Sequence, residues 1–332
     1  MLIIVWKSDN ILHKYTAKAY ATAMFDSHAH MIDAAFDADR EALIAQLFAS
    51  GVTGWIEVGT SVEESKRAIA LAQTDGRIFA SVGVHPHELK KMQEEDWVEI
   101  KRLLEVYEVN SPRFATPHPR PVVCAIGEVG LDFSRVVIPD LIGDPSVGDP
   151  ANRRAGVDSR FRGNDTVTNE IGFQGQMLRK FIELAQEKSL PVIFHVRSGV
   201  IAMDAHEELI RILKTYSDSD RPRGVIHTFS GTLAQAQQYI ALGMMISFSG
   251  VVTFKNTGEL PEAAKTIPIE CMLVETDCPY LTPMPHRGER NDPSFLKHII
   301  QYIADLRGAS FADIERVTQE NANNLFCQHS VQ

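Results

Sequence analysis

The sequence predicts an α/β fold in which eight parallel strands close into a (β/α)8 barrel, a TIM barrel. Short runs rich in Val, Ile and Phe alternate with amphipathic stretches of helical period along most of the chain. Eight such apolar runs are present, and acidic or imidazole side chains end six of them. Active sites of such barrels lie at the C-terminal ends of the strands, so this distribution favours a closed barrel over a doubly wound sheet, where these groups would cluster at one switch point.

The expected elements follow the chain in regular order. Each expected strand is a short run of β-branched and aromatic residues next to turn-forming residues. The expected strands cover residues 24–30, 53–59, 78–85, 122–128, 191–197, 224–229, 244–249 and 271–277. The expected helices cover residues 39–49, 62–74, 95–107, 174–188, 204–215, 232–242, 293–307 and 310–326.

Two segments interrupt this alternation. Residues 134–169 are rich in Gly, Pro, Asp and Arg without helical or strand period, which predicts a long, flexible loop inserted after the fourth strand. Residues 108–121 contain four prolines and predict an extended surface loop. We expect residues 24–332 to form one barrel domain, and residues 1–23 to be an N-terminal extension whose order the sequence leaves open.

The composition is that of a globular protein without a membrane segment. Lys and Arg number 33 against 43 Asp and Glu, and the resulting net charge of −10 argues against non-specific coating of nucleic acid. A local basic rim could still bind phosphate. The four cysteines form no C-x-x-C pair, so neither a zinc ribbon nor a disulfide framework is indicated. We expect a cytoplasmic protein with no membrane partner and no obligate protein partner.

The ends of the expected strands carry groups that suit metal binding. His28 and His30 are two residues apart, so on a strand they point to the same side and can hold one ion. Glu128 and Asp277 each follow an apolar run, where a buried carboxylate costs several kcal/mol unless it is paired or coordinated. Lone histidines at such positions are more often hydrogen-bonded core residues, but two more end the fifth and sixth strands, His195 and His227. Binding of a divalent cation would explain why these imidazoles and carboxylates all stand at the ends of apolar strands.

Six protein ligands exceed what one catalytic zinc ion uses, because such ions keep three protein ligands and one open position. Two ions about 3.5–4 Å apart, sharing a bridging carboxylate, are therefore expected. Imidazole ligands suit zinc or manganese better than magnesium, but the sequence leaves the choice among Zn, Mn and Mg open.

At this level of detail the chain resembles the TatD family of metal-dependent deoxyribonucleases, within the amidohydrolase-like barrel superfamily. The resemblance runs in family order from residue 26 to residue 288. The matching segments are 26–30 (DSHAH), 83–87 (GVHPH), 127–132 (GEVGLD), 191–197 (PVIFHVR), 227–231 (HTFSG), 247–250 (SFSG), 275–281 (ETDCPYL) and 285–288 (PHRG).

The resemblance implies a role for each strand-end residue. One metal would be held by His28, His30, Glu128 and Asp277, and the other by Glu128, His195 and His227. Glu128 would thus bridge the two ions. Asp277 would also orient or deprotonate the attacking water, so Asp277 and Glu128 are the expected catalytic residues. Asp132 would orient a ligating histidine.

Contacts to substrate are expected from residues around the site. The candidates are His85, Arg197, His286 and Arg287, with Arg290 as a further phosphate contact. A structural turn is an equal explanation for His85, and exposed arginines are usually only solvated. The chain also departs from the family pattern, because residues 198–203 separate the fifth-strand motif from the acidic residue Asp204 that should follow it directly.

Three functions remain open at this stage. The leading one is a nuclease, expected to be an exonuclease, that hydrolyses phosphodiester bonds in DNA. The alternative is a hydrolase of small esters, amides or lactones with the same ligands, because one barrel supports many chemistries. The third is a metal-binding protein without turnover, against which the complete ligand set argues.

Overall fold

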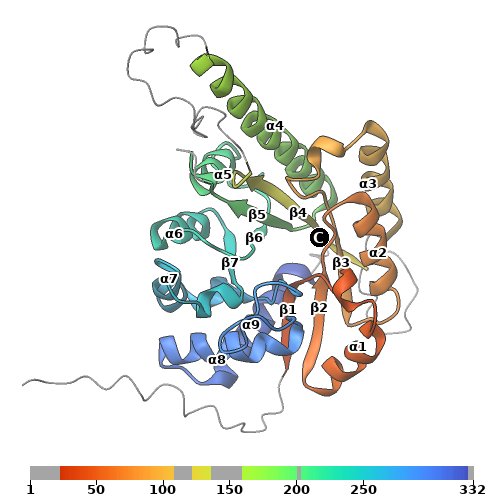
Figure 1. Ribbon diagram of the computed structural model, residues 1–332, viewed down its shortest axis with the longest axis vertical. Helices are drawn as coiled ribbons and strands as arrows, with labels where there is room; N and C mark the ends of the chain where they lie inside the picture. Colours follow the sequence, from red (N-terminus) through yellow and green to blue (C-terminus); the bar gives the residue numbers. More distant parts are fainter. Residues whose placement is uncertain (1–22, 108–121, 136–158, 200–202, 328–332) are drawn as a thin grey trace, which may run out of the picture.

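A computed structural model describes residues 23–107, 122–135, 159–199 and 203–327, and eight parallel strands form one barrel sheet in it. The strands are β1 (Met24–Ala29), β2 (Val52–Glu57), β3 (Ile78–Val82), β4 (Val123–Asp132), β5 (Val192–Arg197), β6 (Gly224–Ile226), β7 (Met244–Phe248) and β8 (Met272–Val274). Each strand pairs with the next along the chain, in the order β1 to β8. The predicted TIM barrel is confirmed (Figure 1).

Helices form the outer layer around these strands (Figure 1). They are α1 (Arg40–Ala49), α2 (Val62–Ala72), α3 (Glu94–Tyr107), α4 (Ser159–Lys188), α5 (Ala205–Leu213), α6 (Leu233–Ala241), α7 (Leu260–Thr266), α8 (Leu296–Arg307) and α9 (Phe311–Phe326). Side-chain caps fix several helix starts. Ser61 accepts a hydrogen bond from the backbone N–H of Glu64, and Thr232 and Gln235 form a capping box.

The apolar core has two parts. The larger part lies between the strands and the helices and includes Trp55, Phe181 and Tyr239 among its fully buried side chains. The smaller part contains residues from every strand except β7, whose partly buried Met245 packs against it, together with Ala322, Leu325 and Phe326 of α9. It therefore fills one end of the barrel interior, as expected of a barrel that is packed rather than hollow. The polar strand ends lie at the other end.

Several expected boundaries are wrong. Residues 159–169 belong to α4 rather than to the inserted loop, because this stretch contains no proline and its single Gly163 does not prevent helix formation. Strand β4 continues to Asp132, four residues past its expected end. Helix α7 was not predicted, because seven residues that include Pro261 in the first turn give too short a periodic pattern.

Some expectations fall outside the described residues. They concern residues 1–22 of the N-terminal extension, residues 108–121, residues 136–158 of the insertion after β4 and residues 200–202 of the segment after β5. A single domain over residues 24–332 therefore remains a prediction. In the part of the chain that the structure describes, no helix has the length and apolar character needed to cross a membrane.

Candidate metal centre

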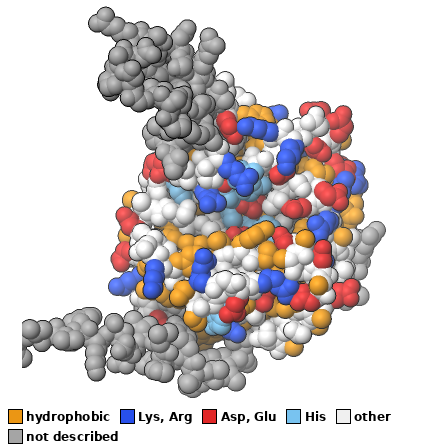
Figure 2. Space-filling model, in the orientation of Figure 1, with side chains coloured by type: hydrophobic (Ala, Val, Ile, Leu, Met, Phe, Trp, Pro, Cys, Tyr) orange, Lys and Arg blue, Asp and Glu red, His pale blue; other side chains and the backbone are white. Residues whose placement is uncertain are grey.

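The predicted ligands meet at the C-terminal end of the barrel. His28, Glu128 and His195 lie within β1, β4 and β5, whereas the other three ligands follow strand ends. A pocket of about 710 Å³ opens here, and it is lined by five of the six, His30, Glu128, His195, His227 and Asp277. Figure 2 looks into this opening, where histidine side chains are visible at the centre, with basic side chains beside them and a band of hydrophobic side chains along one border.

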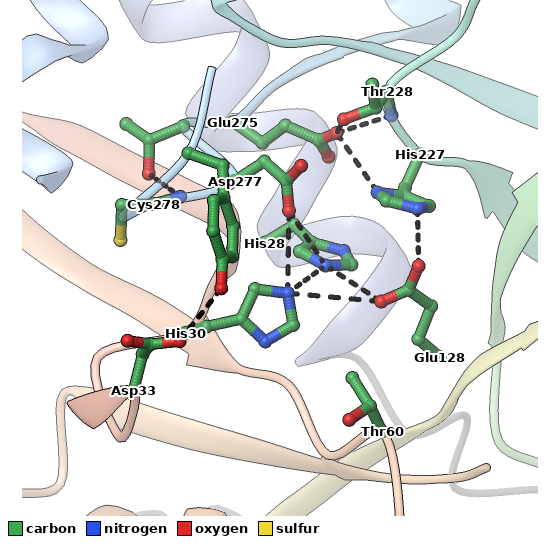
Figure 3. Close-up of polar contacts among 12 residues, drawn as sticks. His28, His30, Asp33, Thr60, Glu128, His227, Thr228, Glu275, Asp277 and Cys278 are labelled. Atoms are coloured by element: carbon green, nitrogen blue, oxygen red, sulfur yellow. Dashed lines mark hydrogen bonds and ion pairs between the residues drawn. The ribbon is translucent and has the colours of Figure 1, made fainter. Parts of the chain in front are cut away.

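The first group of ligands contains His28, His30 and Asp277. The Nε2 atoms of the two histidines are 3.1 Å apart. Oδ1 of Asp277 lies 3.6 Å from Nε2 of His28 and 3.4 Å from Nε2 of His30 (Figure 3). Three ligand atoms at these separations can surround a single cation at the usual bond length of about 2.0–2.2 Å.

The second group contains His195, His227 and Glu128. Nδ1 of His195 lies 2.5 Å from Oε1 of Glu128 and 3.1 Å from Nε2 of His227. Oε1 of Glu128 is 2.8 Å from Nε2 of His227. These three atoms also converge, at hydrogen-bond distances from one another that are no longer than the shortest separation in the first group.

Glu128 faces both groups, one with each carboxylate oxygen. Its Oε1 contacts the second group, whereas its Oε2 lies 3.4 Å from Nε2 of His28 and 3.9 Å from Nε2 of His30. Burial acts to raise the pKa of Glu128, but the charge of His227 and the hydrogen bonds from the histidines hold that pKa well below its usual value. Glu128 is therefore an ionised carboxylate placed between two sets of imidazoles.

The backbone next to two of these strand ends is strained. Thr228 and Asp277 have φ angles of 39° and 56°, in the left-handed region that residues other than glycine rarely adopt. The backbone N–H of Asp277 donates to the carbonyl of His28 at 3.0 Å, and that of Thr228 donates to Glu275 at 2.5 Å. Hydrogen bonds within the site thus hold the strained residues in place.

Two buried carboxylates lie behind the second group. Oδ2 of Asp132 is 2.9 Å from Nε2 of His195, as expected for the orienting partner. Glu275, to which sequence reasoning gave no role, has Oε1 3.4 Å from Nδ1 of His227. Burial acts to raise the pKa of Glu275, but hydrogen bonding and charge from His227 lower it to about 2. Its place after the apolar run of β8 was the signal that could have identified it.

These residues fit a divalent cation by the chemistry of their donor atoms. The rings of His28 and His227 stack with centroids 4.0 Å apart and an interplanar angle of 11°. Burial lowers the pKa of His28, whereas Glu128 and Glu275 hold the pKa of His227 above its usual value despite burial, so without a bound cation only the His227 ring of this pair carries a proton. A cation bound at these nitrogens would replace that proton. Neutral imidazoles with anionic carboxylates are the ligand set of zinc and similar transition metals. Nδ1 of His28 is buried and has no hydrogen-bond partner among the described residues, so no contact at that nitrogen orients the ring.

His85 also lies beside the centre, with Nε2 3.7 Å from Oε1 of Glu128. The backbone N–H of His87 donates to Nδ1 of His85 at 3.1 Å, which places the ring proton of a neutral His85 on Nε2. Burial lowers the pKa of His85 to about 3, so the ring is neutral. A protonated Nε2 is a donor and cannot be a metal ligand.

The expected substrate contacts divide into two kinds. His85 and Arg197 line the pocket, whereas His286 and Arg287 do not. The guanidinium of Arg287 instead covers the ring of Phe254 at 3.9 Å. His286 and Arg290 make ion pairs away from the pocket. His286 pairs with Glu289, and Arg290 pairs with Asp39. Pocket-lining residues that sequence reasoning missed include Arg135 and Tyr280.

Comparisons with known proteins agree with this geometry. The family model described as TatD related DNase matches residues 25–327. The uncharacterized metal-dependent hydrolase YabD of Bacillus subtilis is 33% identical, with 91% of this chain and 98% of that protein covered. The 3′-5′ ssDNA/RNA exonuclease TatD of Escherichia fergusonii is 32% identical over the same shares. The crystal structure of YjjV, a TatD homolog from Escherichia coli, superposes with a TM-score of 0.71 at 26% identity, covering 92% of this chain and 99% of that one.

Proposed function

Because this chain belongs to the family of TatD-related DNases, we propose that it is a metal-dependent exonuclease that hydrolyses phosphodiester bonds in DNA. The name of one relative supports single strands as the substrate and the 3′ end as the starting point. The proposal includes a two-ion centre and a cytoplasmic location.

The observation that carries the proposal is the position of Glu128 between two groups of ligands. Each of its oxygens lies near a different group, which is the arrangement of a carboxylate that bridges two ions. His28, His30, Glu128 and Asp277 would hold one ion, and Glu128, His195 and His227 the other. When bound, two such ions supply Lewis-acid stabilisation of phosphate charge and lower the pKa of a water molecule.

The chain's own residues would then position substrate and water. Asp277 lines the pocket, so its carboxylate can orient the attacking water and accept a proton from it. His85 would donate a hydrogen bond from its Nε2–H to a phosphate oxygen, and Arg197 would pair with a phosphate at the pocket border. Asp132 and Glu275 would keep His195 and His227 in their ligating orientation.

The test is cleavage of end-labelled oligonucleotides by the purified protein. Single- and double-stranded DNA would be incubated with Mg²⁺, Mn²⁺ or Zn²⁺ separately, beside a panel of simple esters and lactones. We expect a product ladder on single strands that Glu128→Gln and Asp277→Asn each abolish. Glu320→Gln is the matched control, because this exposed carboxylate pairs with Arg316 on α9. Turnover of esters or lactones without DNA cleavage under any metal would overturn the nuclease in favour of the small-molecule hydrolase.

A further inference from the structure

The pocket has two chemically different walls on opposite sides of the metal centre. Tyr280, Leu281, Val251 and Ile32 line it from the segments that follow β8, β7 and β1. Arg135, which follows β4, and Arg197, at the end of β5, line it from the other side. In a barrel of eight strands in sequential order, β4 and β5 lie across from β8 and β1. One wall thus presents an aromatic and three aliphatic side chains beside the carboxylates of Asp33 and Asp277, and the other presents two arginines beside the carboxylates of Glu128 and Asp132.

Tyr280 is the dominant side chain of the first wall. It is 57% exposed, although large apolar side chains usually lose most of their surface in the fold. Figure 2 shows hydrophobic side chains in a band at the border of the hollow that contains the histidines. An aromatic ring held open to solvent at the edge of a polar site has a free face on which a flat apolar group can stack.

The ring of Tyr280 is also fixed in position. Its hydroxyl donates to Oδ2 of Asp33 at 3.0 Å, a contact that reaches from the β8 side to the segment after β1. Its backbone N–H donates to the carbonyl of Asp277 at 3.0 Å, and the fully buried Asn291 donates to its carbonyl at 2.5 Å. A ring fixed in this way loses little side-chain entropy when a ligand stacks on it.

We propose that Tyr280 stacks on the terminal nucleobase of the substrate, while Arg135 and Arg197 pair with phosphate across the metal centre. This inference rests on the proposed nuclease function and adds a nucleobase subsite to it. A nucleotide carries an anionic phosphate at one end and a flat base at the other, and the two walls match these groups. Stacking accepts every base, so the subsite recognises that a base is present rather than which base it is.

The kinetic test compares two single strands that differ only in the 3′-terminal residue, which is adenosine in one and an abasic tetrahydrofuran residue in the other. The wild-type protein should cleave the strand with the terminal base more efficiently. Tyr280→Ala should lower kcat/KM on that strand by about tenfold, within the range for stacking of one base on an aromatic ring. It should leave kcat/KM on the abasic strand within about twofold of wild type.

Two further variants separate stacking from a structural role. Tyr280→Phe keeps the ring and should retain the preference for the base, whereas Tyr280→Leu keeps an apolar side chain and should lose most of it. Phe173→Ala is the matched control, because this exposed aromatic side chain on α4 does not line the pocket. An equal loss on both strands in Tyr280→Ala would show a structural role and overturn the subsite.

A binding measurement keeps the subsite separate from the nuclease proposal. The metal-loaded protein would be titrated with 2′-deoxyadenosine 5′-monophosphate and with 2-deoxyribose 5-phosphate. The subsite predicts tighter binding of the nucleotide in the wild type and equal binding of both ligands in Tyr280→Ala. If no DNA is cleaved, the nuclease proposal fails and this comparison still decides on the subsite. Equal affinity of the wild type for the two ligands would overturn it.

Discussion

The carboxylate of Asp26 on β1 accepts two hydrogen bonds from Thr276, which follows β8. The backbone N–H of Thr276 donates to Oδ1 at 2.9 Å and its hydroxyl donates to Oδ2 at 2.5 Å. Among the described strands, each ladder joins consecutive strands and none joins β1 to β8. This buried contact therefore connects the first and last strands of the barrel, directly beside the candidate ligands His28 and Asp277.

Replacing Asp26 by alanine should lower the free energy of unfolding by about 2–4 kcal/mol. The change removes both hydrogen bonds from Thr276 and a third from the backbone N–H of His28, which donates to Oδ1 of Asp26 at 3.2 Å, and it leaves these buried donors without that acceptor. Urea denaturation of the metal-free protein would measure the effect. Asp305→Ala is the control, because that exposed side chain only accepts a hydrogen bond from Gln301 on the surface of α8. Equal stability of the two variants would show that the contact contributes little to barrel closure.

Removing both histidines of β1 should remove one metal ion and leave the fold intact. In His28→Ala/His30→Ala, the first group keeps only Asp277 and one oxygen of Glu128, whereas the second group is unchanged. Native mass spectrometry should count one ion fewer than in the wild type, and circular dichroism should be unchanged. His298→Ala on α8 is the matched histidine control. Retention of the full number of ions would refute the assignment of these two ligands.

Glu275 should control the affinity of the second group for its ion. Its Oε1 accepts hydrogen bonds from the backbone and the hydroxyl of Thr228 and lies 3.4 Å from Nδ1 of His227. In Glu275→Gln the anionic partner of His227 is lost, which typically weakens metal binding by about 10- to 100-fold. Titration with a competing chelator would show one weakened ion and one unchanged ion. Equal weakening of both ions would instead indicate a general distortion of the site.

The fold and the convergence of the candidate ligands could be predicted because both depend on local patterns. Each strand is a short apolar run, and each ligand stands at the end of such a run, so one topological rule brings the ligands together. The loops could not be predicted in this way. Arg287 is covered by contact with Phe254 and Arg290 pairs with Asp39, and neither partner is close in sequence.

The orienting carboxylates show the same limit. Asp132 was expected to orient a histidine because the family resemblance places it near the site and ligating imidazoles usually donate their other N–H to a carboxylate, but no sequence pattern says that the histidine is His195 rather than another one. The exposure of Tyr280 also could not be predicted from the sequence, because aromatic residues beside an apolar run are usually buried. Both features depend on contacts between segments far apart in the chain.

Acid should destabilise the protein partly through His206, a buried histidine of α5 outside the ligand set. Burial lowers the pKa of His206 to about 4, from 6.5 in the unfolded chain. Its ring nitrogens face the hydroxyls of Tyr239 and Ser230 at 3.2 and 3.3 Å, so no carboxylate is hydrogen-bonded to a protonated ring. Below pH 6.5 the unfolded state binds a proton that the folded state excludes.

Above pH 6.5 His206 is neutral in both states and its burial does not lower the free energy of unfolding. As the pH falls toward 4, the free energy of unfolding decreases by about 3 kcal/mol because of this residue. Urea denaturation at several pH values should give a shallower decline for His206→Gln than for the wild type, because glutamine binds no proton in this range. Titration of the candidate metal ligands affects both proteins equally, so it does not contribute to the difference between the two curves. His286→Gln at the exposed border should follow the wild-type curve. Parallel curves for His206→Gln and the wild type would show that His206 is protonated in the folded state without cost.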